Sequence, residues 1–140
     1  MAHAAYDFEV ITPDGPAFRG RVRSIRLPGK TGNFGILARH APLVAALDPG
    51  LLVLSQEGGE KGAFAVGEGF VEVRTGRVRA LVDFCNRREQ IDVARAEKAR
   101  DRARERLRSR KEATLDFVRA EAALRRALAR LSVARYSGLD

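Results

Sequence analysis

The chain has 140 residues, of which 45% are apolar and 31% are charged, and this composition excludes a disordered protein. Its formal net charge at pH 7 is +8. No uncharged apolar run is long enough to span a bilayer, which excludes direct insertion into a membrane. The N-terminus lacks the basic region and apolar stretch of a secretory signal, and Cys85 is the only cysteine, so we expect a cytoplasmic protein.

Two parts of the chain differ in composition. All five prolines precede position 50, and twelve of the thirteen glycines precede position 77. Residues 1–86 carry 10 basic and 9 acidic side chains, whereas residues 87–140 carry 16 basic and 9 acidic ones. We therefore predict two structural units, residues 1–86 and residues 87–140, of which the second carries nearly all of the net positive charge.

Residues 1–86 have the pattern of antiparallel β structure. Apolar residues alternate with charged ones from Tyr6 to Val10 and again from Arg77 to Phe84, as in strands with one solvated face. Glycine, proline and aspartate mark turns at short intervals, at 13–16, 48–50, 58–59, 67–69 and 75–76. Many short strands between such turns predict a β-sandwich or a flattened barrel.

Residues 87–140 have the composition of helices. Alanine, arginine and glutamate predict a first helix from about Asp92 to Arg110, with acid–arginine pairs three residues apart at Asp92–Arg95, Glu97–Arg100, Asp101–Arg104 and Glu105–Arg108. A polar break at 109–114 precedes a second helix, whose apolar face comprises Phe117, Ala120, Leu124, Leu128 and Leu131. The short connection predicts an antiparallel two-helix hairpin, and therefore an α+β fold for the whole chain.

Few large apolar residues hold the first helix down. Between Asp92 and Lys111 only Val93 and Leu107 are large and apolar, and a fully buried side chain of this kind contributes about 1.5–3 kcal/mol. We infer an arm that can leave its resting place at modest cost. The alternative is a hairpin packed permanently on the β unit through its alanines and its second helix, and the sequence leaves both readings open.

Motifs for catalysis are absent from the sequence. It contains two histidines and no His-Glu-x-x-His, and the glycines of 29–32 lack the spacing of a phosphate-binding loop. His40 lies in a predicted loop, where a structural or partner-facing role is favoured over metal binding. Cys85 is expected to be a small buried apolar residue. We therefore expect a protein that is not an enzyme and that has neither a catalytic nor a metal site.

Basic residues lead to two functional hypotheses. Four of them recur every four residues and form one row on the first helix, which suits a solvated face or an acidic partner: Lys98, Arg102, Arg106 and Arg110. The net charge also raises the hypothesis of a nucleic-acid-binding module. Residues 87–140 contain only Phe117 and Tyr136 as aromatic residues and no known nucleic-acid-binding motif, so we expect no nucleic acid partner.

A second arginine pattern is more specific. Arg95 and Arg102 project from one side of the first helix, near Asp92. By the same count, one face of the second helix carries Arg119, Arg126 and Arg130. If the hairpin closes with these faces together, several guanidinium groups converge, and planar guanidinium groups bind phosphate oxygens in pairs. The two interpretations are a polyphosphate site and a salt-bridged, solvated surface.

Six short motifs occur in order along nearly the whole chain. They are Thr12-Pro13-Asp14-Gly15-Pro16, Gly32-Asn33-Phe34-Gly35-Ile36-Leu37, His40-Ala41-Pro42-Leu43, Val66-Gly67-Glu68-Gly69-Phe70-Val71-Glu72-Val73, Ile91-Asp92-Val93-Ala94-Arg95-Ala96 and Arg130-Leu131-Ser132-Val133-Ala134. Together they resemble the epsilon subunit of bacterial F-type ATP synthase. The resemblance implies an N-terminal β-sandwich of about ten strands, followed by a C-terminal helical hairpin.

The resemblance also implies a function and a set of partners. The chain would be a non-catalytic subunit of the central rotor stalk, peripheral to the cytoplasmic face of the bacterial plasma membrane. It would lie against the gamma subunit and the ring of c subunits, with its 30–33 loop facing that ring. Such a subunit couples catalysis to proton flow and inhibits ATP hydrolysis through a mobile hairpin, which extends along gamma and presents its basic row to an acidic segment of the beta subunits.

In some bacterial members of this family the compact hairpin binds ATP, so the resemblance implies ATP as a regulatory ligand and no required cofactor. The matching positions here are Ile91, Asp92, Arg95, Ala96, Arg102, Arg126 and Arg130. ATP-binding relatives have a glutamate five residues before the motif's isoleucine, where this chain has Asn86, which keeps hydrogen-bonding groups and loses the charge. Relatives also commonly have Pro-Gly where this chain has Ala38 and Arg39.

Overall fold

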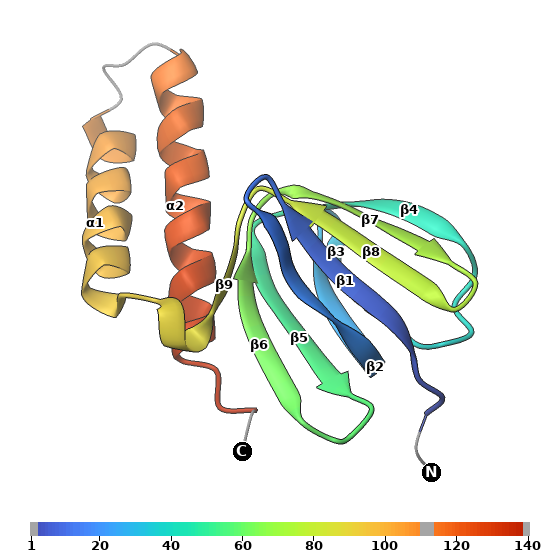
Figure 1. Ribbon diagram of the computed structural model, residues 1–140. Helices are drawn as coiled ribbons and strands as arrows, with labels where there is room; N and C mark the ends of the chain where they lie inside the picture. The colour runs from blue at the N-terminus through green and yellow to red at the C-terminus, as the bar shows by residue number, and fades with distance from the viewer. Residues whose placement is uncertain (1–2, 110–113, 139–140) are drawn as a thin grey trace.

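The computed structural model describes residues 3–109 and 114–138, in which nine strands form a β-sandwich and two helices form a hairpin beside it (Figure 1). The strands are β1 (Tyr6–Thr12), β2 (Gly15–Gly29), β3 (Gly32–Ile36), β4 (Leu43–Leu47), β5 (Gly50–Gln56), β6 (Lys61–Val66), β7 (Gly69–Arg74), β8 (Arg77–Val82) and β9 (Cys85–Arg87). The expected α+β fold is confirmed, with nine strands in the described residues where the resemblance implied about ten. The division of the chain at residue 86 stays a prediction.

Strand β2 joins the two layers of the sandwich because it is long enough to pair with different strands at its two ends. Its first half pairs with β1, and its second half pairs with β3 and β5. The order of neighbours is β1-β8-β7-β4-β2-β5-β6-β9, and β3 pairs with β2 outside this order. The strands pair in antiparallel fashion, as expected, except that β1 and β8 are parallel. Strand β1 lies between β2, which follows it directly in the chain, and β8, which comes much later.

Alternation along the strands places one set of side chains in the core. On β1, Tyr6, Phe8 and Val10 are buried, whereas Asp7 is exposed. The Tyr6 hydroxyl donates a hydrogen bond of 2.6 Å to the carbonyl oxygen of Ile36, so the one buried hydroxyl of β1 is satisfied and the strand is tied to β3. The period-two pattern in the sequence therefore predicts the buried face of this strand correctly.

The helical hairpin comprises α1 (Val93–Ser109) and α2 (Thr114–Ala134), and it is preceded by a short 3-10 turn, η1 (Arg88–Gln90). Helix α2 lies between α1 and the sandwich, and the two helices run antiparallel, as predicted (Figure 1). On α1 the buried residues are Ala96 and Ala103, two turns apart on the side that contacts α2. No helix among the described residues is long and apolar enough to cross a membrane.

Small apolar side chains dock α2 on the sandwich. Ala129 and Val133 of α2 are buried against Ala63 and Ala65 of β6. The predicted apolar face of α2 is therefore wrong in part, since Phe117 and Leu128 are 45% and 41% exposed. The physical reason is that α2 has neighbours on two sides, so two narrow stripes are buried, one with Ala120, Ala127 and Leu131 and the other with Ala129 and Val133.

Polar contacts fix the base of the hairpin. Arg88 donates hydrogen bonds to the backbone carbonyl oxygens of Ala134, at 3.3 Å, and of Tyr136. The first of these carbonyls is that of the last residue of α2 and the second lies two residues beyond it, where orphan acceptors and the helix dipole favour a cation. Arg125 of α2 also pairs with Asp48 at 3.8 Å. The hairpin is thus attached to the sandwich through α2, both near its C-terminal end and at Arg125.

The predicted ladder of acid–arginine pairs on α1 forms only in part. Glu105 and Arg108 pair at 3.5 Å, but Arg100 pairs with its neighbour Asp101 at 3.0 Å. Asp92 contacts the backbone N–H of Arg95 and not its guanidinium group. Exposed ion pairs contribute little, so local geometry decides which of them form.

Candidate functional site

A cleft of about 560 Å³ opens between the two helices near the base of the hairpin. All seven residues predicted from the sequence to bind a nucleotide line it: Ile91, Asp92, Arg95, Ala96, Arg102, Arg126 and Arg130. Asn86 and Gln90 line it as well, together with Lys98, Ala99, Ala123 and Ala127. Arg119, which shares the predicted face of α2, is exposed and is not among the lining residues.

Asp92 sets where α1 begins, and thereby which α1 side chains face the cleft. One of its carboxylate oxygens accepts a 3.1 Å hydrogen bond from the backbone N–H of Arg95, and its carbonyl oxygen accepts one of 3.0 Å from Ala96. These contacts are those of a helix N-cap. Because two turns of helix separate Arg95 from Arg102, both arginines line the same side.

Alanines form the floor between the helices. Ala96 and Ala127 are buried, and a side chain of this size lets two helices approach closely. The exposed side chains of Arg95, Arg102 and Arg126 line the cleft around these alanines. The cleft is therefore a consequence of the alternation of alanine and arginine in both helices.

Arg130 is held in place by its neighbours. Its Nε donates a 3.1 Å hydrogen bond to Oδ1 of Asn86, and its guanidinium carbon lies 4.1 Å from the centre of the Phe84 ring. Burial lowers the pKa of Arg130, and the charges of Arg126 and Arg95 lower it further. Three positive groups are thus close enough to repel one another, and an anion in the cleft would relieve that repulsion.

The cleft contains far more cations than anions. Arg95, Lys98, Arg102, Arg126 and Arg130 line it, with the carboxylate of Asp92. Within the part of the chain that the structure describes, none of these five cations belongs to an ion pair, whereas other arginines of the hairpin do. All of them except Arg130 are exposed, so the cations of the cleft are solvated and not salt-bridged. Five cationic side chains that donate hydrogen bonds suit a multiply charged oxyanion.

The basic row of the first helix is divided in this structure. Lys98 and Arg102 line the cleft, whereas Arg106 does not. Arg110, the last member of the row, lies outside the described residues. Part of the row therefore lines the cleft in the docked hairpin, although all three described members of the row are exposed to solvent.

Other residues considered in the sequence have local roles. His40 lies in the loop after β3, and its Nδ1 is 2.8 Å from the carbonyl oxygen of Ala41. Cys85 on β9 is half-buried, and burial raises the pKa of its thiol to about 12. The described residues contain no group of three or more histidine, cysteine, aspartate or glutamate side chains that could hold a metal ion.

The sequence patterns did not predict an ionic cluster on the outer face of β1, which Glu9 forms with three arginines. Glu9 is only 7% exposed because three guanidinium groups, themselves solvated, cover it. It contacts Arg79 at 2.6 Å, Arg19 at 3.2 Å and Arg77 at 3.7 Å. The hydrogen bond from Arg79 is the main reason that the pKa of Glu9 lies below its ordinary value. The alternation in the sequence predicted that the charged residues of β1 and β8 lie on a solvated face. It did not predict that Arg77 and Arg79 lie beside Glu9, because this depends on the pairing of β1 with β8.

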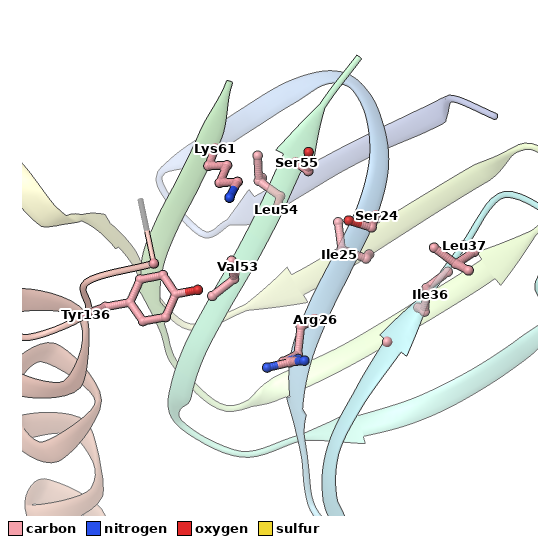
Figure 2. A pocket seen from close by; sticks show the side chains of 12 residues that line it. Ser24, Ile25, Arg26, Ile36, Leu37, Val53, Leu54, Ser55, Lys61 and Tyr136 are labelled. Atoms are coloured by element: carbon pink, nitrogen blue, oxygen red, sulfur yellow. The ribbon is translucent and has the colours of Figure 1, made fainter. Parts of the chain in front are cut away.

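A second cavity, of about 490 Å³, lies on the outer face of β2, β3 and β5 (Figure 2). Tyr136, just beyond α2, stands at one side of it, and Arg26 and Lys61 also line it. It gathers none of the residues that the sequence singled out as a binding site.

An apolar row crosses the outer face of four adjacent strands. Strand register places Ile11 of β1 beside Leu81 of β8, Leu81 beside Phe70 of β7, and Phe70 beside Ala46 of β4. Phe70 is 44% exposed, and Val44, next to it on β4, is 68% exposed. Grouped apolar side chains that face solvent commonly mark a docking surface.

Two protein-family models match the chain. One is described as the β-sandwich domain of the ATP synthase delta/epsilon chain and matches residues 5–88. The other is described as the long α-helix domain of the same chain and matches residues 89–135.

Relatives named "ATP synthase epsilon chain" are similar over most of the length. The relative from Shouchella clausii is 43% identical over 135 residues, which are 96% of this chain and 98% of that protein. The relative from Exiguobacterium is 42% identical over 124 residues, which are 89% of this chain and 91% of that protein.

Solved structures extend the similarity to the fold. A chain in the cryo-EM structure of the Euglena gracilis mitochondrial ATP synthase, comprising OSCP, F1 and the c-ring, superposes with a TM-score of 0.82 at 27% identity, covering 97% of this chain and 84% of that one. A chain in the central stalk and c-ring of the Tetrahymena thermophila mitochondrial ATP synthase has a TM-score of 0.63 at 13% identity, covering 96% and 99%. The second likeness shows the fold alone.

Proposed function

The chain belongs to the delta/epsilon family of ATP synthase subunits, and on that premise we propose that it is the epsilon subunit of a bacterial F-type ATP synthase. In this role it is a non-catalytic part of the central rotor stalk, peripheral to the cytoplasmic face of the membrane, and it couples catalysis to proton flow. The match of both family models, which together span residues 5–135, supports this proposal.

The apolar row supports a contact with the gamma subunit. Ile11, Leu81, Phe70 and Val44 offer a relatively flat, solvent-facing apolar surface on rigid strands, which suits a permanent partner. Residues 30–33, which form the turn between β2 and β3 and the start of β3, are the proposed contact with the c ring. Thr31 and Asn33 are exposed and available to a partner.

Co-purification tests the gamma contact. Phe70→Asp places a charge in the apolar row and should abolish co-purification with the gamma subunit, because an unpaired carboxylate would be buried in the interface. Phe117→Asp is the matched control, since Phe117 is 45% exposed and Phe70 is 44% exposed. The gamma proposal fails if the parent chain does not co-purify with gamma, or if both variants behave alike.

The hairpin supports a regulatory role. We place the ATP site in the cleft, and the observation that carries this proposal is the convergence of four arginines without acidic partners: Arg95, Arg102, Arg126 and Arg130. ATP bound there would hold the two helices together and keep the hairpin docked. An extended hairpin would instead present Lys98 and Arg102 to an acidic segment of the beta subunits and inhibit hydrolysis. The same cations serve both roles, so nucleotide binding and extension exclude each other.

An amide NMR titration of ATP into the isolated chain tests the nucleotide site. Shifts should cluster at residues 91–102 and 126–130, and Arg126→Ala should remove them. Arg104→Ala serves as the control, because Arg104 is exposed on α1 and does not line the cleft. An unchanged response in Arg126→Ala, or no shifts in the parent chain at millimolar ATP, would refute the site.

A further inference from the structure

A row of charged residues runs beside the apolar row on the outer face of β1, β8 and β7. Strand register places Glu72 of β7 beside Arg79 of β8. Arg79 in turn lies beside Glu9 of β1, and Glu9 lies beside Arg19 of β2. Charge alternates along this row, so each residue has a neighbour of opposite sign, which stabilises paired strands. The hairpin docks on the other layer of the sandwich, through β5 and β6 (Figure 1).

The alternation of charge breaks down one row farther toward the turn between β7 and β8. Arg74 of β7 lies directly opposite Arg77 of β8, and like charges in directly opposite positions destabilise a pair of strands. Arg74 contacts Glu72 at 2.8 Å. Arg77 reaches Glu9 only at 3.7 Å, which is too long for a hydrogen bond. The carboxylates of the chain therefore offset the repulsion between the two arginines only in part.

A small cavity of about 160 Å³ opens beside these two arginines. Arg74, Arg77 and Arg79 line it together with Glu72, and we call it the arginine cavity. The side chains of Arg74 and Arg77 are well exposed to solvent. Three guanidinium groups thus share the cavity with one carboxylate, and guanidinium groups bind carboxylate oxygens in pairs. The chemistry of the cavity suits one further carboxylate.

The arginine cavity adjoins the apolar row on the same face of the sheet. Glu72 is two residues from Phe70 on β7, and Arg79 is two residues from Leu81 on β8, so each pair projects from one side of its strand. A partner that covers the apolar row therefore removes water from the arginines as well. A charge that is taken out of water without a counter-charge is costly. A matching partner surface has an acidic side chain at this point.

We infer that the arginine cavity receives an aspartate or glutamate side chain of the subunit that covers the apolar row. This inference rests on the proposed function, in which that subunit is gamma. The apolar row supplies buried area, whereas the arginine cavity selects the partner and fixes its register. A surface without a carboxylate at this point would leave the charges of Arg74 and Arg77 desolvated and uncompensated.

Rebinding of the full chain to the gamma-containing complex of the ATP synthase, from which the chain has been removed, tests the inference. Arg77→Ala should weaken rebinding by about thirtyfold, the lower end of the effect of removing one partner from a buried charge pair. Arg26→Ala is the matched control and should rebind like the parent chain, because Arg26 is an exposed arginine on the outer face of the other layer. Rebinding of the parent chain should weaken more steeply with salt than that of Arg77→Ala, which lacks the charge pair.

Thermal unfolding of the isolated variant separates docking from folding. Arg77→Ala should unfold at the same temperature as the parent chain, because it loses the long contact with Glu9 and also the repulsion from Arg74. Weaker rebinding that is matched by a lower unfolding temperature would mean that Arg77 acts only through the fold, and it would overturn the inference.

The remaining outcomes separate this inference from the gamma contact itself. If the parent chain does not rebind, the gamma proposal fails and the inference fails with it. If Phe70→Asp abolishes rebinding but Arg77→Ala binds like the parent chain, the gamma contact stands and the inference is overturned. Equal weakening in Arg26→Ala also overturns it, because net charge alone would then explain the effect. Binding of the isolated parent chain to anionic phospholipid vesicles, lost in Arg77→Ala, would assign the cavity to headgroup phosphates and overturn a protein carboxylate as its occupant.

Discussion

Replacing Val133 with alanine should release the hairpin from the sandwich in a much larger fraction of molecules. Val133 is fully buried in a cluster with Ala63, Ala65 and Ala129, against which larger, partly buried side chains also pack. Removing two methyl groups costs about 1.6 kcal/mol in transfer free energy, and the cavity left behind raises the loss to about 2 kcal/mol. Since 1.4 kcal/mol corresponds to a factor of ten, the ratio of docked to undocked molecules should fall about thirtyfold.

Electron spin resonance distances between labels on the two units measure this ratio. Cysteines replacing the exposed residues Asp14 and Arg104, in a Cys85→Ala background, place one label on the sandwich and one on α1. Val118→Ala is the matched control, because Val118 lies on the same helix, is 56% exposed and undergoes the same change in helix propensity. If Val133→Ala and Val118→Ala give the same distance distribution, the small apolar interface does not hold the hairpin.

Three further predictions follow from local contacts. Arg88→Ala should speed amide exchange at Tyr136 by about tenfold relative to Arg135→Ala, because the hydrogen bonds to the carbonyl oxygens of Ala134 and Tyr136 are lost; equal rates would contradict the role of Arg88. Ionised Glu9, whose pKa lies below the ordinary 4.5, stabilises the fold above that pH and loses this effect as pH falls through the folded-state pKa. Thermal unfolding of Glu9→Gln should therefore depend less on pH below 4.5 than that of the parent chain, and parallel curves would refute it. Alkylation of Cys85 by iodoacetamide at pH 8 should be about 1,000-fold slower in the folded chain than in urea, because burial raises the thiol pKa from 9.0 to about 12; similar rates would contradict this.

Helical spacing made much of the candidate site predictable. Arg95 and Arg102 are seven residues apart, as are Ala96 and Ala103, so each pair lies on one side of α1 whatever the tertiary context. An antiparallel hairpin then brings the first pair toward Arg126 and Arg130. Spacing determines the direction in which a side chain points but not its position along the cleft. Arg119 shares its face of α2 with Arg126 but lies farther toward the tip, and it does not line the cleft.

The buried stripes of α2 and the strand neighbours of β1 depend on tertiary packing and could not be predicted from local sequence patterns. A single apolar face was expected on α2, but a helix between two neighbours buries two stripes, and small side chains such as Ala127 and Ala129 fill them better than Leu128. Alternation predicted which side of β1 is buried, but not that β8 would be its parallel neighbour, so the cluster around Glu9 was not foreseen. Strand partners far apart in sequence are not encoded in a local pattern.

The distance between sandwich and hairpin in the assembled ATP synthase, measured with and without ATP, tests the regulatory proposal most directly. Labels at positions 14 and 104 should give one short distance at millimolar ATP, because the nucleotide holds the helices together in the docked state of Figure 1. Without ATP a longer distance should become populated, and in Arg126→Ala the two conditions should give the same distribution. A distance distribution of the parent chain that does not change when ATP is removed would contradict a hairpin latched by nucleotide.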